Sequence, residues 1–267
     1  MKYFNTIVLL VVLLFASCKS DAPKKDVKEQ DDVAKQETSA KAQKYTLTPF
    51  TPSAAYPDAN LTNMNYKAGK FSFDVTSETY NLGTQTPDAG AKMCANSGKG
   101  QHIHLIVDNS PYAAKYTDTF DHDVADGDHT ILAFLSRSYH ESIKTSTAHI
   151  LKNVTVKDKA IVSSSDVTVP MVTYSRPKGK YVGDDAKKVM LDFYLSNLDM
   201  KDGYSVTASI NGENHNIVKW QPYYIEGLPM GKNKITLTLM RDGQAVDTPL
   251  NPVTREFELL SDPAPNK

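Results

Sequence analysis

Histidine is concentrated in one part of this chain. Six of the seven histidines lie between His102 and His149. His102 and His104 are two residues apart in the segment His-Ile-His-Leu-Ile-Val, which alternates between polar and apolar residues as a strand does. Side chains two apart on a strand leave the same face, so the two imidazoles can converge on one metal ion. One hypothesis is therefore a copper or zinc site built on His102 and His104.

Three further side chains could join that site, and one of them is Asp108. His122 lies in an Asp-His-Asp loop, and Cys94 follows Met93, so that a sulfur ligand would favour a softer ion such as copper or zinc. The spacing matches no complete ligand motif, so the expectation of no cofactor stands beside the metal hypothesis. His129 opens an expected strand, where we expect it to hydrogen-bond the turn.

A second concentration of polar groups follows the expected strand at 130–135. Residues 136–144 read Ser-Arg-Ser-Tyr-His-Glu-Ser-Ile-Lys. These residue types could suggest a hydrolase, but neighbours in one loop rarely align as nucleophile, base and orienting group, and the chain has no Gly-x-Ser-x-Gly motif. We therefore expect no enzyme, and a loop tied down by its own hydrogen bonds, with Arg137 bridging to a carboxylate or to backbone carbonyls.

Basic and aromatic residues also recur at 174–181, which read Tyr-Ser-Arg-Pro-Lys-Gly-Lys-Tyr. Arginine and aromatic side chains are the usual anchors of interfaces, so this segment and the 136–144 loop predict a surface that binds a protein, peptide or glycan. The residues predicted to bind that partner are Arg137, Tyr139, His140, Glu141, Arg176 and Lys178. Trp220, Tyr223 and Tyr224 are instead expected to pack in the core or between domains.

The elements that position these residues are expected to be strands. Six segments alternate in hydrophobicity and are separated by Gly, Asn, Asp and Pro at short intervals, which is typical of antiparallel sandwiches. They are residues 70–75, 102–107, 130–135, 189–195, 204–210 and 234–239. No stretch after residue 45 keeps a helical period over three turns, so the predicted fold class is all-β.

Two parts of the chain match each other. Val-Asp-Asn at 107–109 aligns with Ile-Asn-Gly at 210–212, and Gly-Asp-His-Thr-Ile at 127–131 aligns with Gly-Lys-Asn-Lys-Ile at 231–235. The nearly constant offset indicates a tandem duplication of one unit. We predict two tandem immunoglobulin-like β-sandwich domains at 45–158 and 168–262, the first of them rich in histidine and carrying an insertion at 84–100.

Composition and charge limit the partners. Lys plus Arg is 30 and Asp plus Glu is 31, so the net charge is −1 and nothing favours nucleic acid as a partner. Residues 18–44 mix charges and contain little that is apolar, so we expect a disordered linker there.

The N-terminus has the pattern of an export signal. Lys2 precedes an apolar run at 7–15, too short to span a bilayer, which needs about 20 residues, and small residues then lead to Cys18. The pattern resembles a bacterial lipoprotein signal, so residues 1–17 should be removed and Cys18 acylated. We expect a cell-envelope protein held to a membrane by this lipid. Because Lys19 replaces the aspartate that retains lipoproteins in the inner membrane, we expect the outer membrane, on its periplasmic or surface face.

Longer segments resemble a family of bacterial lipoproteins, common in Bacteroidetes and often labelled phosphopeptide-binding protein. The segments are HIHLIVDNSPY, DGDHTILAFLSRSYHESIK, YSRPKGKYVG, MLDFYLSNLDMKDGY and VKWQPYYIEGLPMG. The resemblance covers residues 65–245 and implies an anchored, non-enzymatic protein of two domains. The Gly-Arg signature of forkhead-associated phosphopeptide readers does not occur in this sequence.

Overall fold

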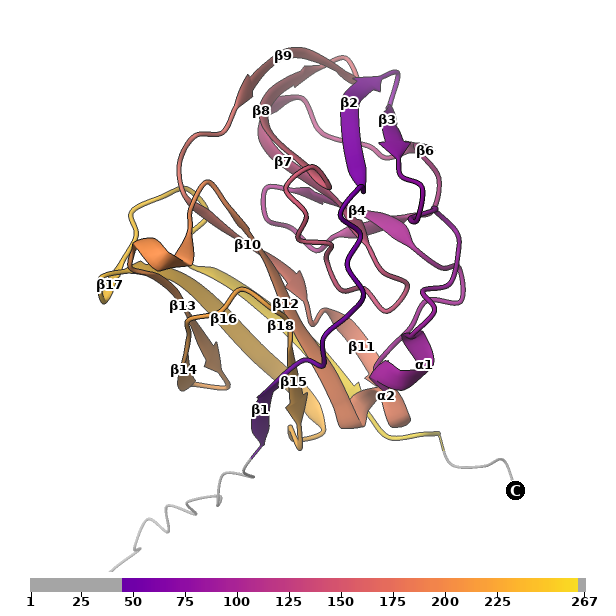
Figure 1. Ribbon diagram of the computed structural model, residues 1–267. Helices are drawn as coiled ribbons and strands as arrows, with labels where there is room; N and C mark the ends of the chain where they lie inside the picture. Colours follow the sequence, from indigo (N-terminus) through magenta and orange to yellow (C-terminus); the bar gives the residue numbers. More distant parts are fainter. Residues whose placement is uncertain (1–44, 264–267) are drawn as a thin grey trace, which may run out of the picture. The chain divides into compact units, whose positions relative to one another are not determined.

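A computed structural model describes residues 45–263 as an almost entirely β structure. The predicted signal peptide, the lipidated Cys18 and the linker up to residue 44 lie outside the described residues. In the described part, the strands form two tandem immunoglobulin-like β-sandwiches, which Figure 1 shows with the first sandwich above the second. No helix of this part is long and apolar enough to cross a membrane.

The first sandwich packs a three-stranded sheet on a five-stranded sheet. The three-stranded sheet has the order β2 (Asn60–Lys67), β3 (Lys70–Thr76), β6 (Thr119–Asp121). The five-stranded sheet has the order β5 (Ala113–Lys115), β4 (His102–Val107), β7 (Gly127–Ser136), β8 (His149–Lys157), β9 (Ala160–Asp166). Every pair of neighbours is antiparallel. The helix α1 (Ala89–Lys92) lies in the predicted insertion.

The second sandwich is built in the same way from two larger sheets. One has the order β1 (Thr46–Pro49), β15 (Tyr223–Glu226), β12 (Lys188–Ser196), β10 (Met171–Arg176). The other has the order β11 (Gly179–Val182), β18 (Val253–Leu260), β16 (Gly231–Arg241), β13 (Tyr204–Ile210), β14 (Glu213–Ile217), with β17 (Gln244–Ala245) beside β16. The short helical turns are α2 (Asp184–Lys187) and η1 (Met200–Asp202). Only β11 and β18 pair in parallel among these strands.

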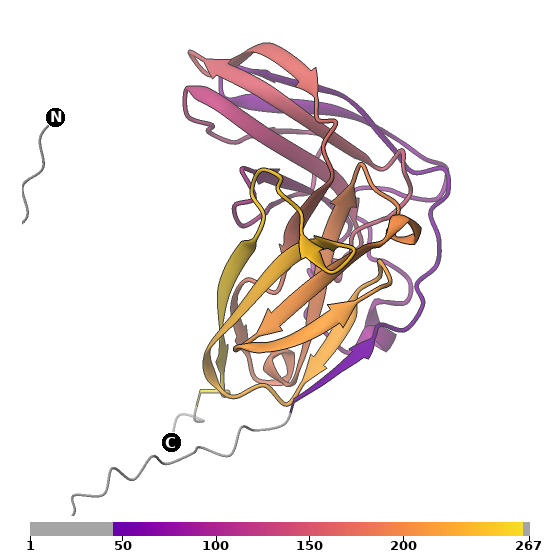
Figure 2. The same ribbon diagram turned by 90° about the vertical axis from the view of Figure 1, so that its left-hand side faces the viewer.

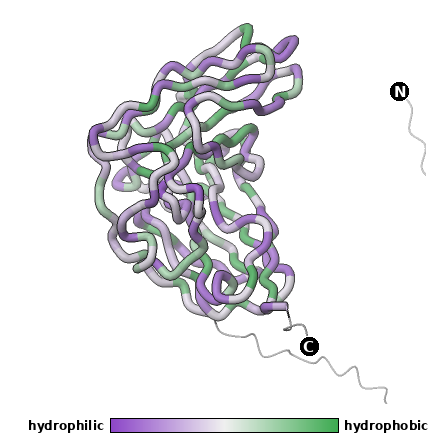
Figure 3. The backbone as a smooth tube through the Cα atoms, turned by 90° about the vertical axis from the view of Figure 1, so that its right-hand side faces the viewer, coloured by the Kyte–Doolittle hydropathy of each residue, from purple (hydrophilic) through white to green (hydrophobic). Residues whose placement is uncertain are grey.

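Alternation along the strands produces one core in each sandwich. All six predicted strand segments are strands in the structure. Ile103 and Leu105 of β4 point into the core of the first sandwich and are at most 1% exposed. The alternation is visible along the backbone of both sandwiches in Figure 3. Each buried side chain of this size contributes about 1.5–3 kcal/mol relative to its exposed state.

The predicted duplication is visible in one repeated turn. In the first sandwich the Asp108 carboxylate accepts a hydrogen bond from the Thr130 backbone N–H at 2.8 Å. In the second sandwich the Asn211 side-chain oxygen accepts the equivalent bond from the Lys234 N–H at 2.9 Å. The two copies therefore use the same side chain-to-backbone lock between equivalent strands.

Two predicted domain boundaries differ from the structure. Residues 46–49 were expected in the first sandwich, but β1 pairs with β15 and so extends a sheet of the second. The first sandwich was expected to end at residue 158, but β9 continues its sheet to Asp166 by pairing with β8. Backbone pairing overrides chain order here, because a strand joins whichever sheet edge lies nearest and gains hydrogen bonds there.

The two sandwiches meet along a surface that we call the joint, defined by a cluster of buried side chains: Ile106, Tyr112, Leu132, Phe134 and Tyr194. Four of these residues come from the outer face of the β5-β4-β7 region, and Tyr194 comes from β12 of the second sandwich. Trp220 packs edge-on against Tyr194, in agreement with the expectation that it packs in the core or between domains. Figure 2 shows the strands of the two sandwiches one above the other, seen from another side.

Candidate metal centre

Three histidine side chains converge at the joint. His102 Nε2 lies 2.9 Å from His104 Nε2 and 3.0 Å from His140 Nδ1. All three potential ligand atoms lie within 4.8 Å of one another. Ligand atoms bonded to one ion at about 2.0–2.1 Å are about 2.9 Å apart at a right angle and about 3.3 Å apart at a tetrahedral angle. The two spacings from His102 therefore suit a single transition-metal ion.

The remote nitrogens of two of these rings are already held. His102 Nδ1 lies 2.8 Å from the Gly100 carbonyl, so Nδ1 carries the proton and Nε2 presents its lone pair to the cluster. His104 Nδ1 lies 3.4 Å from the Ser175 hydroxyl, which comes from β10 of the second sandwich. Metal-binding histidines almost always have such a partner on the second nitrogen, because it fixes the tautomer and the orientation of the ring.

Strand register explains why His140 reaches this place. His102 on β4 is directly opposite Ser136, the last residue of β7, and His104 is opposite Phe134. The chain turns sharply after Ser136: the Arg137 N–H bonds to the Glu141 carbonyl, and Ser136 and Ser142 form an isolated bridge. His140, at φ 70°, lies at the tip of this turn in the left-handed region. A residue just beyond the end of β7 is thereby placed beside His102.

A buried carboxylate of the second sandwich holds this turn in place. Asp192 on β12 is fully buried and accepts hydrogen bonds from the Ser142 N–H at 3.1 Å and from the Ser142 hydroxyl at 3.2 Å. The Lys144 ammonium lies 2.9 Å from the same carboxylate. The loop that carries His140 is therefore tied to the second sandwich by three bonds to one side chain.

Replacing Asp192 by asparagine should lower the free energy of unfolding by about 3 kcal/mol, because it removes one charge of a buried ion pair. The amide would also present N–H donors to groups that are themselves donors. Urea denaturation measures the change. The matched control is Asp166→Asn, which removes a carboxylate paired with Lys152 at the surface and should cost less than about 1 kcal/mol. Equal losses in the two variants would contradict this role for Asp192.

Burial keeps the histidine cluster uncharged. His102 and His104 are fully buried, whereas His140 is only partly exposed. Burial lowers the pKa of His102 to about 4, against an opposing effect of its bond to Gly100. Burial also holds the pKa of His104 and of His140 well below the usual range, and the positive charge of nearby Arg176 acts in the same direction. All three imidazoles are therefore neutral at pH 7, the form that binds metal.

The other residues predicted for this site are elsewhere, and Asp108 pairs instead with His129 and accepts a hydrogen bond from the Thr130 N–H. The structure does not bring His122 or Cys94 into the converging group of ligand atoms. The His122 ring lies beside Phe71, at the edge of the first core, and the backbone N–H of His122 bonds to the Gly69 carbonyl. Cys94 follows α1 and lines a pocket of about 630 Å³, and burial raises the pKa of its thiol to about 11. His122 and Cys94 are therefore not placed as ligands of this site, because each side chain is held by packing in another part of the fold.

Most residues predicted to bind a partner are buried. Tyr139, Arg137, Glu141 and Arg176 are at most 7% exposed, and only His140 and Lys178 are half-buried. Arg137 donates to the Ala54 carbonyl and lies 3.6 Å from the Glu141 carboxylate, as the expectation of a self-bonded loop predicted. The six side chains therefore do not form an exposed recognition surface.

The polar loop also lacks the geometry of a serine hydrolase. The Ser136 hydroxyl donates to backbone carbonyls of its own turn, and the Ser142 hydroxyl bonds to Asp192. His140 instead faces His102 and the Tyr112 hydroxyl, which lies 3.3 Å from its Nδ1. The Ser138 hydroxyl accepts a hydrogen bond from the Thr86 backbone N–H, so none of the three serines in this loop is paired with its histidine.

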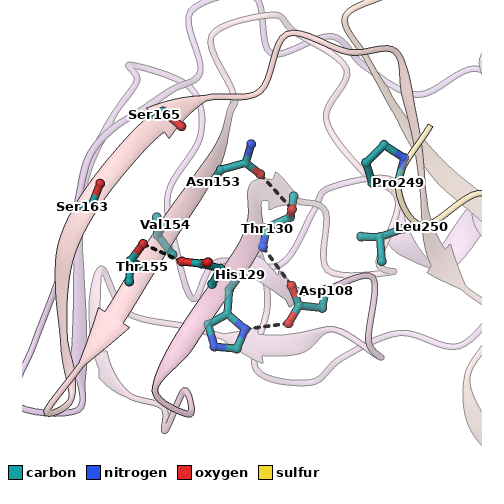
Figure 4. A pocket seen from close by; sticks show the side chains of 11 residues that line it. Asp108, His129, Thr130, Asn153, Val154, Thr155, Ser163, Ser165, Pro249 and Leu250 are labelled. Atoms are coloured by element: carbon teal, nitrogen blue, oxygen red, sulfur yellow. Dashed lines mark hydrogen bonds and ion pairs between the residues drawn. The ribbon is translucent and has the colours of Figure 1, made fainter.

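A polar hollow of about 350 Å³ lies where β4 ends and β7 begins, and Figure 4 shows its lining. His129 Nδ1 lies 2.6 Å from Asp108 and its Nε2 lies 2.9 Å from the Ala125 carbonyl. In the second copy, Asn233 bonds to Asn211 and to the Pro229 carbonyl in the same way, beside a similar hollow. The expected structural role of His129 is confirmed, and the hollow belongs to the repeated unit.

Comparisons with known proteins add little beyond the fold. No family model and no curated protein matches this chain. Among solved structures, fibronectin(III)-like modules of Clostridium thermocellum CbhA are similar over 83% of this chain and 98% of theirs, with 15% identity and a TM-score of 0.29. A fibronectin-III array of RIM-binding protein aligns over 82% of this chain and 74% of its own, with 10% identity and a TM-score of 0.27.

A third similar structure is the extracellular domain of a putative hybrid two-component system, BT3049 of B. thetaiotaomicron. It aligns over 75% of this chain and 38% of its own, with 9% identity and a TM-score of 0.29. At such low identities and TM-scores, neither the arrangement nor the role of these proteins transfers to this chain.

Proposed function

We propose that this chain is a non-catalytic binding protein that holds one divalent transition-metal ion at His102, His104 and His140. The observation that carries the proposal is the convergence of three neutral imidazoles, two of them oriented through their remote nitrogens.

The donor set favours zinc or copper(II) as the ion. Imidazole nitrogen suits both metals, whereas the soft thiolate that would favour copper(I) is not part of the converging group. Three protein ligands leave a further coordination position on either ion. All three ligands come from the first sandwich, and Ser175 of the second sandwich contacts one of them, His104. The metal would therefore link β4 to the turn after β7 within the first sandwich.

We also propose that the protein works outside the cytoplasm on a lipid anchor. Support for this comes from the sequence alone: an apolar run at 7–15 followed by small residues and Cys18. Labelling of growing cells with a palmitate analogue should mark the wild-type protein and not Cys18→Ser. An unlabelled wild-type protein would refute the anchor and would leave the metal proposal untouched.

The metal proposal is tested by titration of the chain from Lys19 onward, which contains every described residue, after treatment with a chelator. We expect zinc or copper(II) to bind at one site with a dissociation constant below about 1 μM, a binding free energy of about −8 kcal/mol or better. Saturating metal should raise the unfolding midpoint, since binding to the native state alone stabilises it. Binding weaker than about 1 mM would overturn the proposal.

A further inference from the structure

Two positive side chains next to the histidine cluster lack a counter-charge. Arg176 ends β10 in the second sandwich and is 7% exposed. Its guanidinium carbon lies 5.3 Å from the centre of the Tyr181 ring, and its Nε has no hydrogen-bond partner. Within residues 45–263, no carboxylate lies within salt-bridge distance of it. A buried charge left in this way costs several kcal/mol.

Lys178 adds a second charge of the same kind two residues later. It is half-buried, and its ammonium lies 4.1 Å from the centre of the Tyr112 ring, which in turn stacks on His104 at 3.6 Å. In the described part of the chain, no carboxylate lies within salt-bridge distance of Lys178 either. Burial and the positive charges of Arg176 and Arg255 lower the pKa of Lys178.

Other cations of this region do have a counter-charge. Lys180, two residues beyond Lys178, pairs with Glu258 at 3.2 Å. Lys144 pairs with Asp192, and Arg137 with Glu141, on the other side of the joint. The fold thus provides carboxylates for Lys180, Lys144 and Arg137, and none for Arg176, Lys178 or Arg255.

We infer that Arg176 and Lys178 bind a small tetrahedral oxyanion, such as phosphate or sulfate, beside the histidine cluster. An unpaired guanidinium fork matches two oxygens of such an anion, and an ammonium supplies a second positive contact. His140, Lys178 and Tyr116, which lie beside the cluster, are half-buried and so reach solvent. This site rests on the unpaired cations, and it does not require the metal.

The two sites are nevertheless coupled by charge. A divalent ion on the histidines would raise the local positive charge, and an anion between Arg176 and Lys178 would offset it. Each ligand should therefore increase the affinity for the other by the same factor, since such a coupling is reciprocal.

The test uses chelator-treated protein and calorimetric titration with sodium sulfate and with sodium phosphate, at ionic strength held constant with sodium chloride. We expect binding at one site, weakened at least tenfold in Lys178→Met and unchanged in Lys180→Met. Lys178 is half-buried and Lys180 is exposed, so neither variant disturbs a core. Arg176→Met is a second variant, used only if its unfolding is still cooperative, and it too should lose the anion.

Equal affinity in Lys178→Met and Lys180→Met would overturn the inference, as would heats no larger than those of chloride alone. Binding of acetate but of neither tetrahedral anion would also overturn it. The metal titration is an independent readout: metal binding without anion binding refutes only this site, and anion binding without metal binding refutes only the metal centre.

Discussion

Replacing His140 by alanine should weaken zinc binding about 100-fold while the protein still folds. Structural zinc sites with four ligands bind with about 10–16 kcal/mol, or about 2.5–4 kcal/mol for each ligand. His140 supplies one of three nitrogens, and it is the only one of them that is partly exposed, at the tip of a surface turn. Its removal therefore deletes a ligand with little effect on the core. Competition against a chelator of known affinity measures the loss.

The matched control for this prediction is His129→Asn. The second copy of the repeat already has Asn233 at that position, with equivalent hydrogen bonds, so the fold accepts the substitution. His129 lies in the turn with Asp108, away from the cluster. Zinc affinity should stay within about twofold of wild type in this variant. If His140→Ala and His129→Asn bind zinc equally well, His140 is not a ligand.

Acidification should destabilise the metal-free protein strongly between pH 6.5 and 4. The folded pKa of His102, about 4, lies below the ordinary value of 6.5, and those of His104 and His140 are lowered as well. In this interval the unfolded chain binds more protons than the native state, so the free energy of unfolding falls as pH falls. The contribution of these neutral histidines to the free energy of unfolding is fully present above pH 6.5. His102 alone should account for about 3 kcal/mol at pH 4, at about 1.4 kcal/mol per pH unit.

The contribution of the cluster can be separated from that of other groups. His129 acts in the opposite sense: burial opposes its charge, but its bonds to Asp108 and to the Ala125 carbonyl outweigh burial and raise its pKa. Its stabilising effect is present at low pH and is lost as pH rises through the folded value. Urea denaturation across this range is therefore best carried out in the His129→Asn background. The free energy of unfolding should fall less steeply with decreasing pH when His140→Ala is added. An unchanged pH dependence would contradict the buried, neutral state of His140.

The strands and the repeat could be predicted because both depend on local patterns. A strand with one face in a core alternates between apolar and polar residues, so segments such as 102–107 and 204–210 can be recognised from the sequence. The repeated turn could be aligned because one short polar side chain, Asp108 or Asn211, locks the same backbone position in each copy. The shared face of His102 and His104 follows from the same period of two.

The third histidine could not be assigned from spacing alone. His140 is far from His102 in sequence and reaches it only because β4 and β7 pair with His102 opposite Ser136. The signal that could have found it is the antiparallel pairing of the two predicted strands, since residues just beyond Ser136 must then lie beside His102. His122 and Cys94 had suitable chemistry, but their positions depend on packing that no periodicity encodes.

The sequence also could not predict that the face of β4 pointing away from the first core is buried. The alternation on β4 indicates which residues avoid the first core, but it cannot distinguish a face in water from a face covered by another domain. Tyr112, Phe134 and Tyr194 close that face, and they bury His104 with it. The same packing buries Arg176, which a charged, Pro-containing segment suggested as an exposed anchor. Contacts between domains therefore decided which predicted residues can meet a partner.

X-ray absorption at the zinc edge of the zinc-loaded protein examines the proposed centre itself. We predict about three imidazole nitrogens at about 2.0–2.1 Å, with the multiple scattering that identifies histidine rings, and fewer imidazoles in His140→Ala. A first shell of oxygen alone, or a spectrum that does not change in His140→Ala, would show that zinc binds elsewhere and that the three histidines only fill the joint.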